Sequence, residues 1–286
     1  MSYVLERISL YENDEIKETN LVIKDCAFYS RDTSVAYIRF MRLQMDKHII
    51  VAGETVIGEL AEYIYKGLDY AMELVLLGAT TVLFPVDVAY EYQVEQALEE
   101  ARKILKAFPL DYVLLLRVPV KAVTPTMVRC CKQNHIPGLI IRIDSEAALQ
   151  EMPINWIREA AFPYKLVFIP QFSSDQEKEA AIWESVFTDS GIVHCRKSVP
   201  IHRHLPKKIL KMIGVYPYKG ILRTGGEVTY NVIQDQHSRS LLNHEVYHDK
   251  IVCTVFKNTV IRAGAEITLP AGLGQELVIK VPGFFQ

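Results

Sequence analysis

Several features that would assign this chain to a familiar class of protein are absent or scarce. The five cysteines are scattered and include no Cys-x-x-Cys pair, a pattern typical of reduced thiols and not of a disulfide framework. Basic residues are not in excess, because 32 Lys and Arg stand against 34 Asp and Glu, giving a net charge of -2 at pH 7. A general nucleic-acid or anionic-membrane binder would carry a basic excess, so we expect neither kind of partner.

Long apolar runs and nucleotide-binding motifs are missing as well. The most apolar run, residues 68–86, is interrupted by Asp69, Glu73 and Gly78, so we expect no membrane span. Residues 1–15 are acidic and lack the basic-then-apolar layout of a signal peptide, which favours a cytoplasmic protein. There is no P-loop, no Gly-x-Gly-x-x-Gly after a strand and no nucleophile elbow, and we expect no cofactor.

The chain does contain enough apolar sequence for a large core, with strand-like patterns at both ends. It has 286 residues, of which 50% are hydrophobic. Apolar and polar residues alternate over short stretches at the two ends, which is typical of strands. Lys257-Asn258 stands where a two-residue hairpin turn would lie. We expect strands within residues 1–52 and at residues 227–233, 251–256, 259–263 and 276–281.

Between the two ends, helical segments alternate with continuous apolar runs. Such runs are typical of parallel strands that are covered on both faces, and their spacing suits βα units. Thr124-Pro125 is a good start for a helix, and Ser174 is a capping residue for another. We expect helices at residues 59–77, 91–107, 125–134, 156–161 and 175–187, and strands at residues 79–86, 111–119, 138–144, 165–172 and 191–195.

The length of this middle region limits the architecture. A complete (β/α)₈ barrel takes about 250 residues, whereas the strand-rich ends leave roughly 150, enough for five or six βα units. The barrel is therefore incomplete, or the strands form an open sheet, or a second copy of the chain covers the gap. Because exposed edges of parallel strands are a liability that proteins usually cover, we expect a homodimer.

One segment resembles a known family. Residues 212–232, MIGVYPYKGILRTGGEVTYNV, are similar to the return segment of the cyclic amidohydrolases, the group of dihydropyrimidinase, dihydroorotase and allantoinase. In that family a helix ends in Gly, a Tyr-Pro-x-Lys-Gly turn follows, and the chain enters a β-sandwich made by both chain ends. LVIKD at residues 21–25, GATTVLFP at 78–85 and KIVCTVFKNTVIRAG at 250–264 also resemble family segments, in the same order.

The resemblance implies a fold and a division of the chain. We expect an α/β protein in which residues 1–55 and 215–286 form a composite β-sandwich domain. Residues 56–214 would form a shortened, incomplete parallel (β/α) barrel-like domain, similar to a TIM barrel that lacks some of its units.

The chain departs from the family where the family binds metal. The family enters its barrel through Pro-Gly-x-x-Asp-x-His-x-His, and this chain has AGETVIGEL at residues 52–60. On that pattern, Val56 stands at the Asp position, and Gly58 and Leu60 stand at the two His positions. Neither Gly nor Leu offers a side-chain lone pair to a divalent cation. We therefore expect a degenerate member of the family without its metal.

Two further histidine pairs have the spacing of metal ligands. Residues 244–248, HEVYH, match His-Glu-x-x-His, which binds zinc only on a helix. A strand-like stretch follows at once, and we interpret this match as coincidence. Residues 202–204, HRH, precede a basic helix and would share a face if extended. They are interpreted as a solvated basic cluster, or as an adventitious metal site or a contact for an acidic partner.

Polar residues near the strand ends form the candidate ligand site. Arg117 and Arg142 each interrupt an apolar strand close to its carboxyl end, where α/β folds bind ligands. Burying a guanidinium is costly unless it is paired, so one interpretation is an internal ion pair, of Arg117 with Asp87 or of Arg142 with Asp144 or Glu146. The other interpretation is a pocket for an anion or carboxylate, made by Arg117, Arg142, Asp144, Gln171 and His194.

Functions of different classes remain open. The first is a catalytically decayed protein that is retained as an oligomeric scaffold, or that binds a small anion or a protein partner. The alternative is a hydrolase of C–N bonds in cyclic amides, with a rebuilt site that uses His194, Asp144 or the histidines of residues 202–204. A ligand-responsive regulatory domain is a third. His194 and Cys195 are neighbours on a strand and point to opposite faces, so no catalytic residue is assigned. Metal dependence separates the first two functions.

Overall fold

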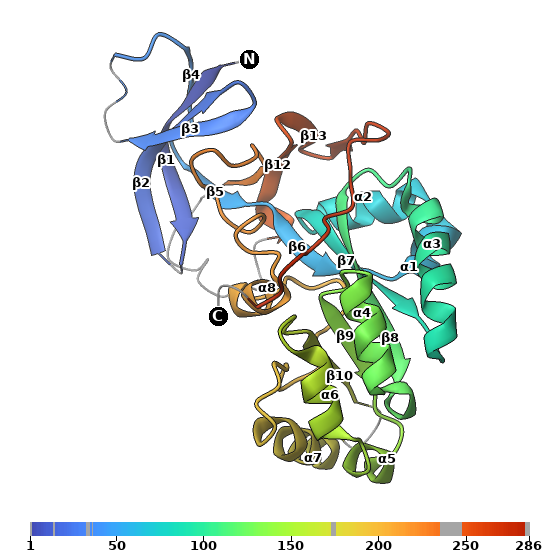
Figure 1. The fold of residues 1–286 in the computed structure, drawn as a ribbon. Helices are drawn as coiled ribbons and strands as arrows, with labels where there is room; N and C mark the ends of the chain where they lie inside the picture. Colours follow the sequence, from blue (N-terminus) through green and yellow to red (C-terminus); the bar gives the residue numbers. More distant parts are fainter. Residues whose placement is uncertain are drawn as a thin grey trace.

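Two β-sheets organise the chain, one built by the chain ends and one by the middle region (Figure 1). The computed structural model describes residues 2–13, 15–32, 35, 37–172, 176–234 and 248–283. Within these residues, no helix combines the length and the apolar character that crossing a membrane requires.

The first sheet is nine-stranded and largely antiparallel. Its order is β14-β13-β12-β11-β5-β1-β2-β3, and β4 pairs with β1. Strand β5 comes from the N-terminal end and pairs antiparallel with β11 from the C-terminal end, so both ends of the chain build this sheet jointly. The strands are β1 (Tyr3–Glu12), β2 (Glu15–Lys24), β3 (Ala27–Asp32), β4 (Met41–Gln44), β5 (His48–Ala52), β11 (Tyr230–Gln234), β12 (Ile251–Phe256), β13 (Thr259–Ala263) and β14 (Glu266–Ile267).

The hairpin of β12 and β13 confirms the expected two-residue turn. Phe256 and Thr259 pair across it, and Lys257 and Asn258 between them have φ of 49° and 62°. Positive φ at both central residues is the conformation of a type I′ turn, whose twist matches that of the flanking strands.

The second sheet holds five parallel strands in sequential order. They are β6 (Glu54–Ile57), β7 (Ala79–Asp87), β8 (Asp111–Pro119), β9 (Gly138–Arg142) and β10 (Val167–Gln171). Successive residues point to opposite faces, and both faces are buried. Phe84 and Leu114 pack in the core that includes the helices, whereas Leu83 and Val113 face an inner core. Burial on both faces explains the continuous apolar runs in the sequence.

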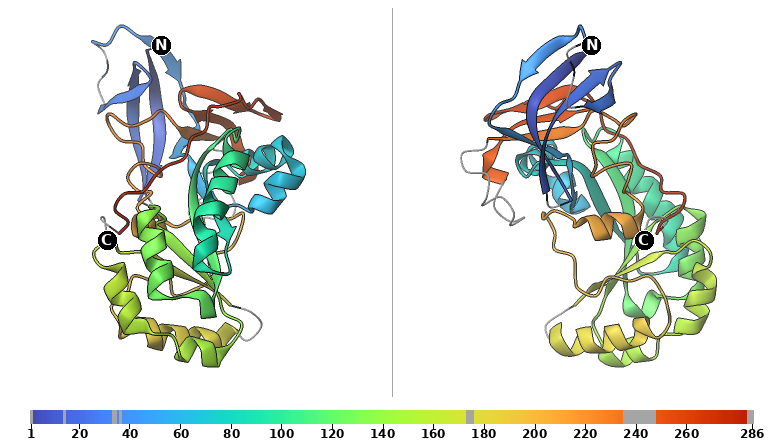
Figure 2. Two further views of the ribbon diagram at one scale, coloured as in Figure 1. Left: turned by 45° about the vertical axis from the view of Figure 1, so that its right-hand side comes forward. Right: turned by 90° about the vertical axis from the view of Figure 1, so that its left-hand side faces the viewer.

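Helices cover the outer side of this sheet, which curls like half of a barrel (Figure 2). Thr124 caps α4 as expected, because its hydroxyl accepts a hydrogen bond from the backbone N–H of Met127 at 3.1 Å. The helix expected at residues 59–77 is broken in two at Gly67, where φ is 61°. Ser174 lies outside the described residues. The helices are α1 (Leu60–Lys66), α2 (Leu68–Leu76), α3 (Val94–Leu105), α4 (Pro125–Gln133), α5 (Glu146–Gln150), α6 (Ile154–Ala161) and α7 (Gln176–Thr188).

One segment, residues 193–205, is hydrogen-bonded to both edges of the parallel sheet. At one edge, the backbone of Phe168 in β10 bonds to residues 193 and 195, at 3.0 and 2.8 Å. At the other edge, the N–H groups of residues 202 and 205 donate to carbonyl oxygens of β6, both at 2.9 Å. Helix α8 (Lys207–Ile213) follows, and its Leu210 and Ile213 pack in the inner core. The chain itself therefore covers part of both edges, and the homodimer, which we expected from open edges, stays a prediction.

Two of the expected strands contribute only single bridges. Within residues 191–195, His194 alone bridges to β10, and within residues 276–281, Glu276 alone bridges to Tyr112 in β8. The single bridge within residues 276–281 has a clear cause. Strand β9 pairs with β8 only from Leu116 onward, so the start of β8 offers a short open edge and the rest is already occupied.

A buried ionic cluster joins the two sheets at the start of β8. Asp111 is fully buried and accepts hydrogen bonds from Lys219 at 2.5 Å and from Lys257 at 2.6 Å. Lys219 also donates to Glu227 at 2.7 Å, just ahead of β11. Although Lys219 lies in the Pro-Tyr-Lys-Gly turn, its side chain is buried, because the residue is only 6% exposed. Its ammonium group is needed to compensate the buried carboxylate of Asp111.

Candidate strand-end site

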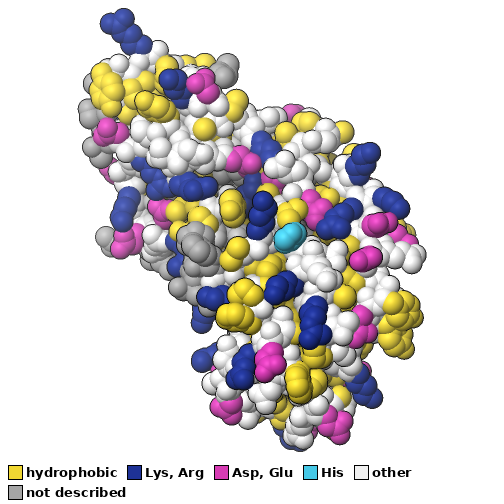
Figure 3. Space-filling model, in the orientation of Figure 1, with side chains coloured by type: hydrophobic (Ala, Val, Ile, Leu, Met, Phe, Trp, Pro, Cys, Tyr) yellow, Lys and Arg dark blue, Asp and Glu magenta, His cyan; other side chains and the backbone are white. Residues whose placement is uncertain are grey.

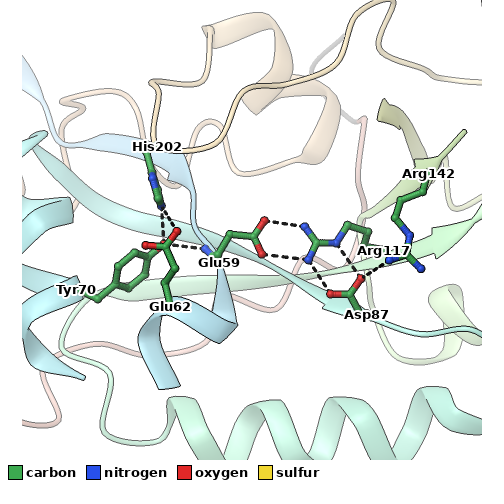
Figure 4. A network of polar contacts seen from close by, with 7 residues as sticks. All are labelled: Glu59, Glu62, Tyr70, Asp87, Arg117, Arg142 and His202. Atoms are coloured by element: carbon green, nitrogen blue, oxygen red, sulfur yellow. Dashed lines mark hydrogen bonds and ion pairs between the residues drawn. The ribbon is translucent and has the colours of Figure 1, made fainter. Parts of the chain in front are cut away.

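The carboxyl ends of the parallel strands bring charged side chains together around Arg117 (Figure 4). Arg117 in β8 donates two hydrogen bonds to the carboxylate of Glu59, at 2.6 and 3.0 Å. It donates two more to the carboxylate of Asp87 at the end of β7, at 2.9 and 2.6 Å. The side chains of Arg117 and Glu59 are 14% and 16% exposed, whereas that of Asp87 is 49% exposed. The planar guanidinium thus holds two carboxylates in bidentate geometry.

Arg142 extends this group at its rim. Its Nη1 donates to Asp87 at 3.3 Å, and both side chains are about half exposed. We call Glu59, Asp87, Arg117 and Arg142 the strand-end cluster. The hydrogen bonds to Asp87 and then to Glu59 raise the pKa of Arg117 above its ordinary value, against the opposing effect of burial. The ion pair between Arg117 and Asp87, one of the two interpretations of the sequence, is therefore present.

The other three predicted site residues have no described contact with the cluster. Asp144 is exposed just after β9. Gln171 ends β10, and its side-chain Oε1 is buried with no hydrogen-bond partner among the described residues. His194 packs against Phe187 of α7, with ring centroids 5.4 Å apart, and its Nε2 is 3.7 Å from a carboxylate oxygen of Glu184. The structure thus brings Arg117 and Arg142 together through Asp87, and a pocket that includes all five predicted residues stays a prediction.

Sequence reasoning missed Glu59 and Tyr70. The backbone N–H of Glu59 donates to the Tyr70 hydroxyl at 2.7 Å, and that hydroxyl is 2.8 Å from Nε2 of His202. Burial raises the pKa of Tyr70, so its hydroxyl stays protonated and can donate to His202. Glu59 was expected only as the first residue of the helix at residues 59–77, and strand β6, which precedes it, was not predicted. No local pattern indicated Tyr70, because its contact with His202 spans the chain from α2 to the segment at residues 193–205.

The metal that the family resemblance implies does not fit the residues present. A Cβ atom built on Gly58 would lie 2.7 Å from Cγ1 of Val82 and 3.0 Å from the hydroxyl of Tyr70. The position that corresponds to the family's first histidine therefore has no room for a side chain, and Leu60 begins α1. Among the residues that the structure describes, no group of three or more His, Cys, Asp or Glu side chains could hold a metal ion.

The two histidine pairs found in the sequence do not change this result. His202 contacts Tyr70, whereas Nδ1 of His204 is 3.0 Å from a carboxylate oxygen of Glu54 at the start of β6. These two histidines are thus directed to different partners. Residues 244–247 of the His-Glu-x-x-His motif lie outside the described residues.

The cysteine beside His194 is held in its thiol form. Burial raises the pKa of Cys195 to about 12, and burial also raises the pKa of Cys131. Because the thiolate is the nucleophile, a thiol with such a pKa is inert at neutral pH.

Comparison with known proteins gives a fold. No model of a known protein family matches the chain, and no curated protein matches it in sequence. Among solved structures, it is similar to the dihydropyrimidinase from Brevibacillus agri NCHU1002, with a TM-score of 0.66 and 7% identity over 100% of both chains. The L-hydantoinase (dihydropyrimidinase) from Arthrobacter aurescens has a TM-score of 0.61 and 12% identity, over 96% of this chain and 99% of that one. The β-aspartyl dipeptidase from Fervidobacterium islandicum AW-1 has a TM-score of 0.55 and 10% identity, over 94% of this chain and 98% of that one.

At these identities the likeness establishes the fold alone. The chain has an amidohydrolase-like architecture, with a curled half-barrel of parallel strands and a separate, largely antiparallel sheet. These dihydropyrimidinase and hydantoinase structures share with the chain the kind of fold that the sequence resemblance predicted.

Proposed function

We propose that this protein is a degenerate amidohydrolase-like protein without metal-dependent hydrolysis, retained as an oligomeric scaffold or as a protein that binds small anions. The observation that carries this proposal is the position of Arg117 between Glu59 and Asp87. The carboxyl ends of barrel strands are where this architecture binds ligands, and two carboxylates that could share a cation there share a guanidinium instead. An arginine remains protonated at all working pH values, so its charge opposes the entry of a divalent cation.

The arrangement of the chain that we propose follows the resemblance. Residues 1–55 and 215–286 form one domain, completed as a β-sandwich, and residues 56–214 form the truncated barrel-like domain. The protein is proposed to act in the cytoplasm as a homodimer. Its small-anion ligand would meet Arg142, the more exposed of the two strand-end arginines, with Asp144, Gln171 and His194 nearby.

A hydrolase of cyclic amides is the second candidate. It is supported by the names of the similar structures, which are dihydropyrimidinases and hydantoinases. Such an activity would need a rebuilt site, for which the exposed Asp144 is the available carboxylate near the strand ends. A carboxylate can act as a general base on water without a metal.

Hydrolysis of a hydantoin and of a dihydropyrimidine, measured before and after incubation with zinc or manganese, separates the two candidates. We expect no turnover above that of heat-inactivated protein in either condition. Turnover that a chelator abolishes would contradict the proposal. Turnover that needs no metal and is lost in Asp144→Asn, but not in the matched surface variant Glu151→Gln, would establish the second candidate.

A further inference from the structure

A continuous groove lies beside helix α8, and no residue of the strand-end cluster lines it. Two hollows of about 700 and 860 Å³ adjoin there. Their walls come from the end of α7, from residues 191–206 and from α8. They share four lining residues, which are His194, Arg196, Lys208 and Met212.

The segment that builds most of this groove carries charge of one sign. Residues 190–226 contain eight Lys and Arg and no Asp or Glu, although the whole chain has a net charge of -2. On the face of the molecule in Figure 3, basic and acidic side chains are interspersed. Such a concentration of positive charge along a hollow attracts an anionic ligand. Six basic side chains of the segment line the groove, which are Arg196, Lys197, Arg203, Lys207, Lys208 and Lys211.

Lys208 and Lys211 are the basic side chains best placed to meet a ligand. They lie three positions apart on α8, so they project from the same side of the helix. Lys211 lies over the ring of Tyr216 at 5.7 Å, and no described carboxylate forms an ion pair with Lys208 or Lys211. Arg196, in contrast, is already paired with Glu184 at 3.0 Å.

The groove also has an apolar lining between its charges. Val199, Ile209 and Met212 contribute to it, and each also packs in or against the inner core of the half-barrel. Basic side chains above an apolar floor match a ligand that alternates carboxylates with apolar groups. An extended peptide has this alternation, because its successive side chains point to opposite sides.

Two other kinds of anion fit the groove less well. A small phosphorylated molecule is bound by polar groups that converge on one point, whereas these basic side chains are spread along two hollows. Single-stranded nucleic acid stacks its bases on Phe, Tyr and Trp side chains, and among the described residues that line the groove only Phe187 is of this kind and it is fully buried.

We propose that this groove binds an extended acidic peptide segment of a partner protein. Its carboxylates pair with Lys208 and Lys211, and its apolar side chains lie on Ile209 and Met212. The proposal rests on the proposed function in one respect only, that a protein without hydrolytic activity acts through a partner. Metal content and hydrolysis are measured independently of this groove, so the failure of the peptide proposal can be distinguished from the failure of the proposed function.

Fluorescence anisotropy of a labelled synthetic peptide tests the proposal. The probe is a peptide of about ten residues that alternates Glu and Leu, long enough to span about 30 Å when extended. We expect Lys208→Glu/Lys211→Glu to weaken its binding to the full-length chain at least tenfold. The matched control Lys103→Glu/Lys106→Glu makes the same change in net charge on exposed positions of and just after α3, and should change the affinity less than twofold.

Four further outcomes test the chemistry of the ligand. A peptide that alternates Glu and Ser should bind more weakly than the Glu-Leu peptide, and added NaCl should weaken both. Equal loss of binding in the groove variant and in the control variant would overturn the proposal, since net charge alone would then explain it. Stronger competition by inorganic phosphate or by a single-stranded RNA than by the unlabelled peptide would overturn it as well. Far-UV circular dichroism of each variant verifies that it is folded.

Discussion

Replacing Arg117 by Met tests the energetic role of the strand-end cluster. The substitution removes four hydrogen bonds of 2.6 to 3.0 Å and leaves the carboxylate of Glu59, only 16% exposed, without its cation. Removing one partner of a fully buried ion pair costs about 3–5 kcal/mol. Asp87 is half exposed and keeps Arg142, so we expect a smaller loss, about 2–3 kcal/mol of the free energy of unfolding.

Urea unfolding followed by tryptophan fluorescence measures this loss, because Trp183 is fully buried in the half-barrel part of the chain. The double variant Arg117→Met/Glu59→Gln should recover at least half of the lost stability, since it removes the uncompensated charge as well. The control is Arg196→Met, whose side chain is 76% exposed and should cost less than about 1 kcal/mol. An Arg117→Met variant as stable as the wild type would refute the reasoning.

Three more substitutions test other parts of the structure. Gly58→His should lower the free energy of unfolding by more than about 3 kcal/mol and bind no zinc, because its Cβ atom would lie 2.7 Å from Cγ1 of Val82 and 3.0 Å from the hydroxyl of Tyr70; unfolding and zinc titration measure both effects. Lys219→Met should cost about 3 kcal/mol, since the fully buried Asp111 loses one of its two cations; a urea midpoint like that of the wild type would contradict this. Burial raises the pKa of Cys195 from 9.0 to about 12, so the folded protein keeps a proton that the unfolded chain releases. Stability should therefore fall as the pH rises above 9, by at most about 1.4 kcal/mol per unit from this group, and Cys195→Ala should flatten that slope.

Local patterns in the sequence predicted the parallel strands of the middle region, whereas the sheet built jointly by both chain ends was expected from the family resemblance. Apolar runs longer than a half-buried strand needs, as in residues 111–119, indicated parallel strands with two covered faces, and both faces are buried. The cap at Thr124 was predicted from the preference of threonine for that position, and the turn at Lys257-Asn258 from its place between two strand-like stretches. Local sequence was sufficient for these strands, the cap and the turn.

The features that the sequence did not predict depend on contacts between distant segments. The segment at residues 193–205 covers part of both edges of the half-barrel. It forms its hydrogen bonds through isolated backbone groups, so its apolar residues need not recur with the period of a helix or of a strand. Lys219 lies in a turn of the sequence with no acidic neighbour, and only the fold places Asp111 beside it. Arg117 was predicted to need a partner from the cost of burying its charge, whereas Glu59, 58 positions away, became visible only in the structure.

Metal content is the most direct test of the central claim, which is that the strand-end site holds a guanidinium in place of a metal. The protein is purified without chelator, incubated with zinc and manganese, and separated from free ions before elemental mass spectrometry at a known protein concentration. We expect less than about a tenth of an equivalent of any transition metal per chain, since Arg117 engages the carboxylates of Glu59 and Asp87. About one or two equivalents that resist dialysis would contradict the account and restore metal-dependent hydrolysis as the function to test.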